Sequence, residues 1–82
     1  MSLNEISKAD AKLIRMGNQI ATFFSSQNDE NAASSVAEHI NKFWEPRMRT
    51  QLFEIADNST DGMYELLKAS LPLINNPSLA DN

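Results

Sequence analysis

The sequence predicts an all-α fold, a small bundle of three to four helices that forms one domain over residues 1–82. Apolar residues recur at the 3.6-residue helical period in several stretches, and no alternating run of β-branched residues indicates a strand. Residues that interrupt helices are few, because the chain has only two Gly and three Pro. A chain of this length buries only about 60–65% of the surface that its unfolded form exposes. We therefore expect a modest hydrophobic core.

The first helix is expected to begin near Ser7. The stretch from Ser7 to Asp10 has the form of a capping box, with a hydroxyl for an unpaired N–H and an acid in the first turn. With Leu13 at the centre of the helical wheel, Ile20 and Phe24 fall within about 20° of it. Flanking apolar residues widen this face beyond what a single core-facing helix needs. The polar stretch SSQNDEN, residues 25–31, should end the helix.

The second helix is expected over roughly residues 30–44. Its apolar face is centred on Ala33, Ala37, Ile40 and Trp44, which follow one another at helical spacing. The two Ala residues are small enough for another helix to approach closely. The first two helices are therefore predicted to form an antiparallel αα-hairpin.

A third helix should begin at Pro46, because Pro disfavours helical angles in the residue before it and suits the first helical position. Met48 lies on its inward face, whereas Arg47 and Arg49 fall about 100° to either side, at the edges of that face. Phe53 lies well off the core-facing side and four residues after Arg49. We expect these two side chains to share an exposed face.

A turn-forming cluster, residues 56–62, separates the third helix from a short fourth one. The fourth helix should turn its apolar side, together with Ser70, toward the core and end at Pro72; the expected inward residues are Met63, Leu66, Leu67 and Ser70. The termini, residues 1–6 and 73–82, are expected to be loosely ordered.

Composition argues against chemistry on this chain. It has no Cys, and therefore no thiol nucleophile and no thiolate ligand for zinc or an iron–sulfur cluster. His39 is the only imidazole, and position 43, where a helical zinc site would need a second His, is Phe. Two isolated Gly residues cannot form a phosphate-binding loop. We expect no catalytic, cofactor-binding or metal-binding residue.

The net charge of −4 and the scattered basic residues argue against nucleic acid as a partner. No run of 18 apolar residues indicates a membrane span, and the N-terminus lacks the pattern of a signal peptide, so the expected location is cytoplasmic. The wide apolar faces, rimmed by Arg, are typical of a surface that binds another protein. The predicted partner-binding residues are His39, Phe43, Arg47, Arg49 and Phe53.

Two stretches resemble a known family. RMGNQIATFFSSQ (residues 15–27) and VAEHINKFWEPRMRTQL (residues 36–52) are similar to the delta subunit of soluble NAD-dependent formate dehydrogenases. Members of that family carry N-Q-I-A-x-F-F and then V-A-x-H-I-x-x-F-W-x-P-R-M-R. Gly17 stands where the family pattern suggests Ala, which either weakens the helix by about 1 kcal/mol or permits closer packing. The matching residues are Asn18, Gln19, Phe23, Phe24, His39, Phe43, Trp44, Pro46, Arg47, Met48 and Arg49.

We assign a structural role to seven residues: Asn18, Gln19, Phe24, Ile40, Trp44, Pro46 and Met48. The resemblance implies a non-catalytic accessory subunit that stabilises the complex or assists its assembly, with the catalytic subunit as its partner. The other subunits would carry a molybdenum or tungsten bis-pterin cofactor, iron–sulfur clusters, FMN and NAD. The isolated chain is a candidate for self-association. Replacing Arg47 or Arg49 by Ala should leave the helices intact and weaken association.

Two alternatives remain at this point. One is a transient assembly or maturation factor for the molybdoenzyme, which does not stay bound. The other, more remote, is a small helical DNA-binding regulator that uses the helix–turn–helix around Pro46 with Arg47 and Arg49.

Overall fold

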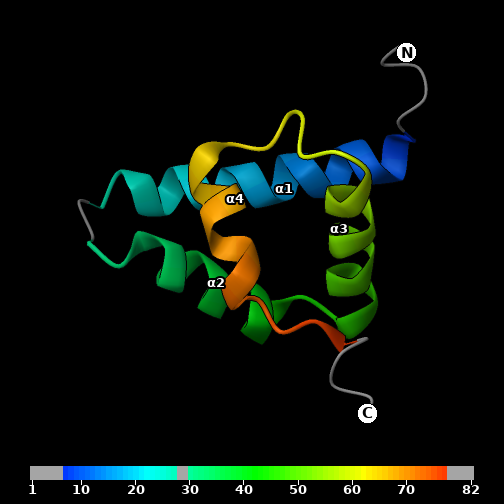
Figure 1. The fold of residues 1–82 in the computed structure, drawn as a ribbon. Coiled ribbons are helices and arrows are strands. Elements are labelled where there is room, and N and C mark those ends of the chain that lie inside the picture. Colours follow the sequence, from blue (N-terminus) through cyan, green and yellow to red (C-terminus); the bar gives the residue numbers. More distant parts are fainter. Residues whose placement is uncertain (1–6, 28–29, 78–82) are drawn as a thin grey trace.

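The computed structural model describes residues 7–27 and 30–77, and this part of the chain contains helices and no strand, which confirms the all-α prediction (Figure 1). The helices in chain order are α1 (Lys8–Ser25), α2 (Ala32–Phe43), α3 (Pro46–Asn58), α4 (Glu65–Ser70) and the short 3₁₀ helix η2 (Leu71–Leu73).

Local chemistry fixes the starts of α1 and α3. The Ser7 hydroxyl accepts a hydrogen bond of 3.0 Å from the N–H of Asp10, as the capping pattern predicts. Pro46 is at the first position of α3, and Glu45 before it has an extended backbone with ψ 153°. Both predicted starts are confirmed.

The second helix is shorter than the predicted range of residues 30–44. It begins after Asn31 and ends at Phe43. Trp44 has already turned to an extended backbone, although its N–H still donates to the carbonyl of Ile40 at 2.9 Å. Trp44 itself remains in the core, only 6% exposed.

The helices pack around one core. As Figure 1 shows, α1 and α2 run antiparallel side by side, α4 lies across both, and α3 packs against α1. Their buried side chains form one cluster, in which Val36, Ile40, Leu52 and Leu67 are completely buried; the other members are Leu13, Ile14, Ala21, Ala37, Trp44, Ile55, Met63 and Ile74. The predicted αα-hairpin and the apolar faces of α2 and α3 are confirmed.

The contact between α1 and α4 depends on Gly17. A Cβ atom at this position would lie 2.8 Å from Cδ2 of Leu67, closer than packed carbon atoms approach. Because Gly17 has no side chain, α4 can sit directly on α1 with Leu67 completely buried. Close packing, rather than a weakened helix alone, is therefore the structural consequence of Gly at this position.

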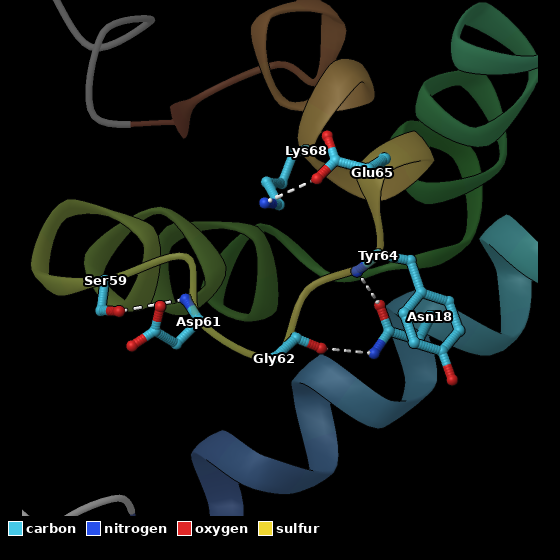
Figure 2. A network of polar contacts seen from close by, with 7 residues as sticks. All are labelled: Asn18, Ser59, Asp61, Gly62, Tyr64, Glu65 and Lys68. Carbon is cyan, nitrogen blue, oxygen red and sulfur yellow. Dashed lines mark hydrogen bonds and ion pairs between the residues drawn. The ribbon is translucent and has the colours of Figure 1, made fainter.

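Asn18 fastens the connection between α3 and α4 onto α1 (Figure 2). Its amide nitrogen donates to the carbonyl of Gly62 at 2.8 Å, and its amide oxygen accepts from the N–H of Tyr64 at 2.8 Å. Gly62 has φ 89°, a left-handed conformation that Gly adopts without strain. The Ser59 hydroxyl accepts from the N–H of Asp61 at 3.0 Å and shapes the preceding turn.

The C-terminal segment differs from the expectation. Pro72 ends α4 but does not end the helical path, because it occupies the first turn of η2. Ile74, which follows, is only 5% exposed and belongs to the core. The Asn41 side chain bonds to this segment twice, donating to the Leu73 carbonyl at 3.3 Å and accepting from the Asn75 N–H at 2.7 Å.

Residues 73–75 thus contact the helices, because Ile74 is buried in the core and Asn41 bonds to the backbone on either side of it. The loose ordering expected for residues 73–82 stays a prediction. The other predicted loose ends, residues 1–6 and 78–82, lie outside the described residues. No helix in the described part of the chain is long and apolar enough to cross a membrane.

Candidate interaction surface

Four rings from α1 and α2 form a continuous group at the surface. Phe23 and Phe24 come from the last turn of α1, and His39 and Phe43 come from the C-terminal half of α2. Phe23 is 58% exposed and Phe43 is 68% exposed, whereas Phe24 and His39 are half-buried. We call these four residues the aromatic surface.

The rings contact one another in sequence from one helix to the next. The centroids of Phe23 and Phe24 are 5.1 Å apart and their planes meet at 83°, an edge-to-face arrangement. Phe24 and His39 are 6.3 Å apart at 64°, and His39 and Phe43 are 4.7 Å apart at 40°. Each exposed outer ring therefore packs against a half-buried ring, Phe23 on Phe24 and Phe43 on His39.

Helix geometry explains this arrangement. Adjacent residues on a helix point about 100° apart, so Phe24 can reach the core while Phe23 cannot. His39 and Phe43 are four residues apart on α2 and therefore lie on the same side of that helix. The antiparallel packing of α1 and α2 then brings Phe24 to His39.

Two hollows flank the rings. A groove of about 360 Å³ lies on one side and is lined by Met16, Gln19, Ile20, Phe23, Phe24, His39 and Trp44. A smaller hollow of about 220 Å³ lies on the other side, lined by Phe24, Ser35, Glu38, His39, Lys42 and Phe43. Because Phe24 and His39 line both, these two rings form the wall between them. A partner side chain placed in the larger groove would contact apolar carbon on several sides, whereas the smaller hollow also presents polar side chains.

The five predicted partner-binding residues do not all lie together. His39 and Phe43 belong to the aromatic surface. Arg47, Arg49 and Phe53 lie on α3 and make no hydrogen bond, ion pair or ring contact with those two among the described residues. Arg47 is exposed, as predicted.

Arg49 is half-buried and bound within the chain, because its Nη1 donates to the carbonyl of Asn75 at 2.9 Å. The Nε of Arg49 is buried without a hydrogen-bond partner in the described structure. Phe53 is half-buried and packs against the core, which corrects the expectation that it shares an exposed face with Arg49. The wheel of a single helix cannot show that a neighbouring element covers its flank.

Four of the seven residues with an assigned structural role lie in the core or pack against it. Ile40 and Trp44 are in the core, Phe24 and Met48 pack against it, and Pro46 opens α3. Asn18 bonds to the α3–α4 connection, as described above, and Gln19 is exposed.

Sequence reasoning missed several exposed apolar residues. Phe23 was recognised as a motif residue but not as part of a binding surface, although its position directly before the inward Phe24 places it off the core. Tyr64 and Leu73 are 55% and 48% exposed and had no signal in the sequence.

The described residues hold no group of three or more His, Asp or Glu that could bind a metal ion. The sequence model of the NADH-dependent formate dehydrogenase delta subunit family, FdsD, matches residues 12–71, well over half of the chain. The chain belongs to this family. Comparisons with curated proteins and with solved structures gave no match.

The family match includes every residue of the aromatic surface as well as Asn18 and Gly17. As a formate dehydrogenase delta subunit, the chain has other subunits of that enzyme as its partners. The two exposed rings on α1 and α2 are therefore candidates for contact with one of them.

Proposed function

We propose that the chain is a non-catalytic accessory subunit that stabilises formate dehydrogenase by binding its catalytic subunit through the aromatic surface. The observation that carries this proposal is the exposure of Phe23 and Phe43, at 58% and 68%, directly over two supporting rings. Burying one such side chain contributes about 1.5–3 kcal/mol. Two rings left open in the isolated chain therefore favour a partner that covers them.

The chemistry of the chain supports an accessory role. It has no Cys and a single His, and that His is packed between two Phe rings. The cofactors that the resemblance assigns to such an enzyme, namely molybdenum or tungsten bis-pterin, iron–sulfur clusters, FMN and NAD, would be carried by the other subunits. Complex formation, rather than a reaction step, is then the contribution of this chain.

Replacement of both outer rings tests the proposal. All subunits would be produced together with an affinity tag on the catalytic subunit, and the amount of this chain that co-purifies would be measured. Phe23→Ser/Phe43→Ser should reduce recovery at least about tenfold, since the two lost rings together remove more than about 1.4 kcal/mol of burial. Leu73→Ser, which also replaces an exposed apolar side chain but lies on η2, is the matched control and should be retained.

Two outcomes would overturn the proposal. Retention of the double variant at the wild-type ratio would show that the aromatic surface is not the interface. If the wild-type chain is required for an active enzyme but is absent from the purified complex, the chain is a transient assembly factor instead. Thermal unfolding of the isolated variant, which should still be cooperative and leave the chain folded at the temperature of the binding experiment, separates lost binding from lost folding.

A further inference from the structure

Three of the seven basic residues lie along one side of α1. Lys8, Lys12 and Arg15 are spaced four and three residues apart, so they share a helix face, and all three are exposed. We call them the basic ridge. The only acid on α1, Asp10, is turned away to α3, where its Oδ1 accepts from Nε2 of Gln51 at 2.9 Å. The ridge is thus a local excess of positive charge on a chain whose net charge is −4.

Helix stability does not account for Lys8, the first residue of the ridge. The N-terminus of a helix carries partial positive charge, so a cation there is unfavourable by a few tenths of a kcal/mol to about 1 kcal/mol. Lys8 is the first residue of α1, and the last turn, where cations would be favourable, has no basic residue. Among the described residues, none of the three ridge side chains forms an ion pair or a hydrogen bond. A cation at this end of a helix, with no partner in the described structure, is typical of a functional surface.

The ridge adjoins the aromatic surface. Arg15 lines a groove of about 420 Å³ on α1 together with Ala11, Ile14, Asn18, Gln19, Thr22 and Tyr64. Gln19 also lines the groove beside Phe23. Because the exposed side chain of Gln19 borders both grooves, the two grooves are neighbours on α1. Along the exposed side of this helix, the cations of the basic ridge are followed by Gln19 and then by Phe23.

We propose that the basic ridge is the second half of the docking surface and binds an acidic segment of the subunit that covers the aromatic surface. The inference rests on the proposed function. Lys8 and Phe23 are 15 residues apart, so the segment extends about 22 Å along α1, with carboxylates at one end and apolar side chains at the other. Carboxylates fit better than nucleic-acid phosphates, since three cations on an acidic chain neutralise too few charges to hold a polyanion.

Charge-reversal variants test whether the basic ridge contributes to binding. Full-length wild-type chain and a variant would be mixed in equal amounts with enzyme that carries a tagged catalytic subunit, and the bound ratio would be measured by mass spectrometry. At about 50 mM salt, Lys8→Glu and Arg15→Glu should each be depleted about threefold to tenfold, and at about 0.5 M salt the depletion should shrink to less than about twofold. Lys68→Glu on α4 changes the net charge equally and should be bound like the wild type.

The melting temperature of the isolated chain should not fall when Lys8 is replaced by Glu, although binding should weaken. Lys8→Glu places an acid at the positive end of α1, so its melting temperature should equal or exceed that of the wild type. Weaker binding together with an undiminished melting temperature is a pattern that a merely structural lysine would not give.

The possible failures are distinguishable. If Lys8→Glu and Arg15→Glu are bound as well as Lys68→Glu at both salt concentrations, the basic ridge is not part of the interface, although loss of the Phe23→Ser/Phe43→Ser variant would still support the proposed function. If that double variant is retained as well, the proposed function fails with it. Binding of the chain to duplex DNA at low salt, abolished by Arg15→Glu, would also overturn the inference.

Discussion

Asn18 shows how a single side chain can join parts of a chain that are distant in sequence. Its amide satisfies the carbonyl of Gly62 and the N–H of Tyr64, 44 and 46 residues further on. The sequence motif indicated that Asn18 is structural, but it could not identify these partners. A side-chain amide can serve many backbone groups, and only the tertiary fold selects which ones.

Asn18→Ala should destabilise the isolated chain by about 1–3 kcal/mol, because it leaves two backbone groups of the loop without their partner. Chemical denaturation would measure the change, and hydrogen exchange should show faster exchange at the Tyr64 amide. Gln19→Ala, the adjacent exposed position on α1, is the control and should change stability by less than about 0.5 kcal/mol. Equal effects of the two replacements would contradict the structural role of Asn18.

The two arginines of the third helix have different environments, although they fall symmetrically on its helical wheel. Arg49 donates to the Asn75 carbonyl, and Arg47 is exposed. Arg49→Ala should therefore lower the free energy of unfolding by about 1 kcal/mol and speed proteolysis of residues 71–77, whereas Arg47→Ala should leave both unchanged. Identical unfolding curves would show that the Arg49 bond does not stabilise the tail. The expectation that both replacements spare the fold is thus kept for Arg47 alone.

At the scale of elements, the helix starts that depend on neighbouring residues were predictable. Ser7 caps α1 and Pro46 opens α3 because the deciding atoms lie within one turn. The end of the fourth helix was not predictable in the same way. Ile74 returns to the core only because α2, through Asn41, offers a place for the segment around it.

The candidate interaction surface was partly predictable for the same reason. The sequence predicted that His39 and Phe43 bind a partner, and the surplus of apolar residues indicated a binding surface. The contact between Phe24 and His39 joins two helices, however, and the covering of Phe53 depends on tertiary packing. Neither can be read from one helix at a time.

Because α4 packs closely on α1, the effect of Gly17→Ala on stability should depend on the side chain at position 67. Gly17→Ala improves helix propensity by about 1 kcal/mol, but the new Cβ would lie 2.8 Å from Cδ2 of the completely buried Leu67. Overpacking of this kind costs about 1–3 kcal/mol, so the single variant should be less stable than the wild type or equal to it.

In a Leu67→Val background the two Cδ atoms that crowd this position are absent, and Gly17→Ala should then be stabilising. A double-mutant cycle by chemical denaturation would measure the coupling between the two positions, expected to be at least about 0.5 kcal/mol. Additive effects would show that α4 can shift to accommodate the methyl group, and that close approach does not explain Gly17.

The whole molecule presents two kinds of surface on and around α1. The basic ridge attracts acidic groups, and its contribution weakens as salt screens it. The aromatic surface is driven by burial of apolar area and is not weakened by salt. These opposite dependences make it possible to tell which surface is in use when the chain is alone and when it is bound.

Without its partner subunits, the chain should self-associate through the aromatic surface. Two copies repel each other because each has a net charge of −4, and salt screens this repulsion. Sedimentation equilibrium should therefore show association that grows between micromolar and millimolar concentration and is stronger at about 0.5 M than at about 50 mM salt. Binding to the partner subunit should have the reverse salt dependence.

Phe23→Ser/Phe43→Ser should be monomeric over the same range, whereas Leu73→Ser should associate like the wild type. A double variant that still associates would mean that self-association uses another surface, with exposed Tyr64 and Leu73 the next to replace. A wild-type chain that stays monomeric at millimolar concentration would show that two copies of the aromatic surface do not fit each other. The two rings would then require a partner of different shape, which the hollows on either side of Phe24 and His39 would have to accommodate.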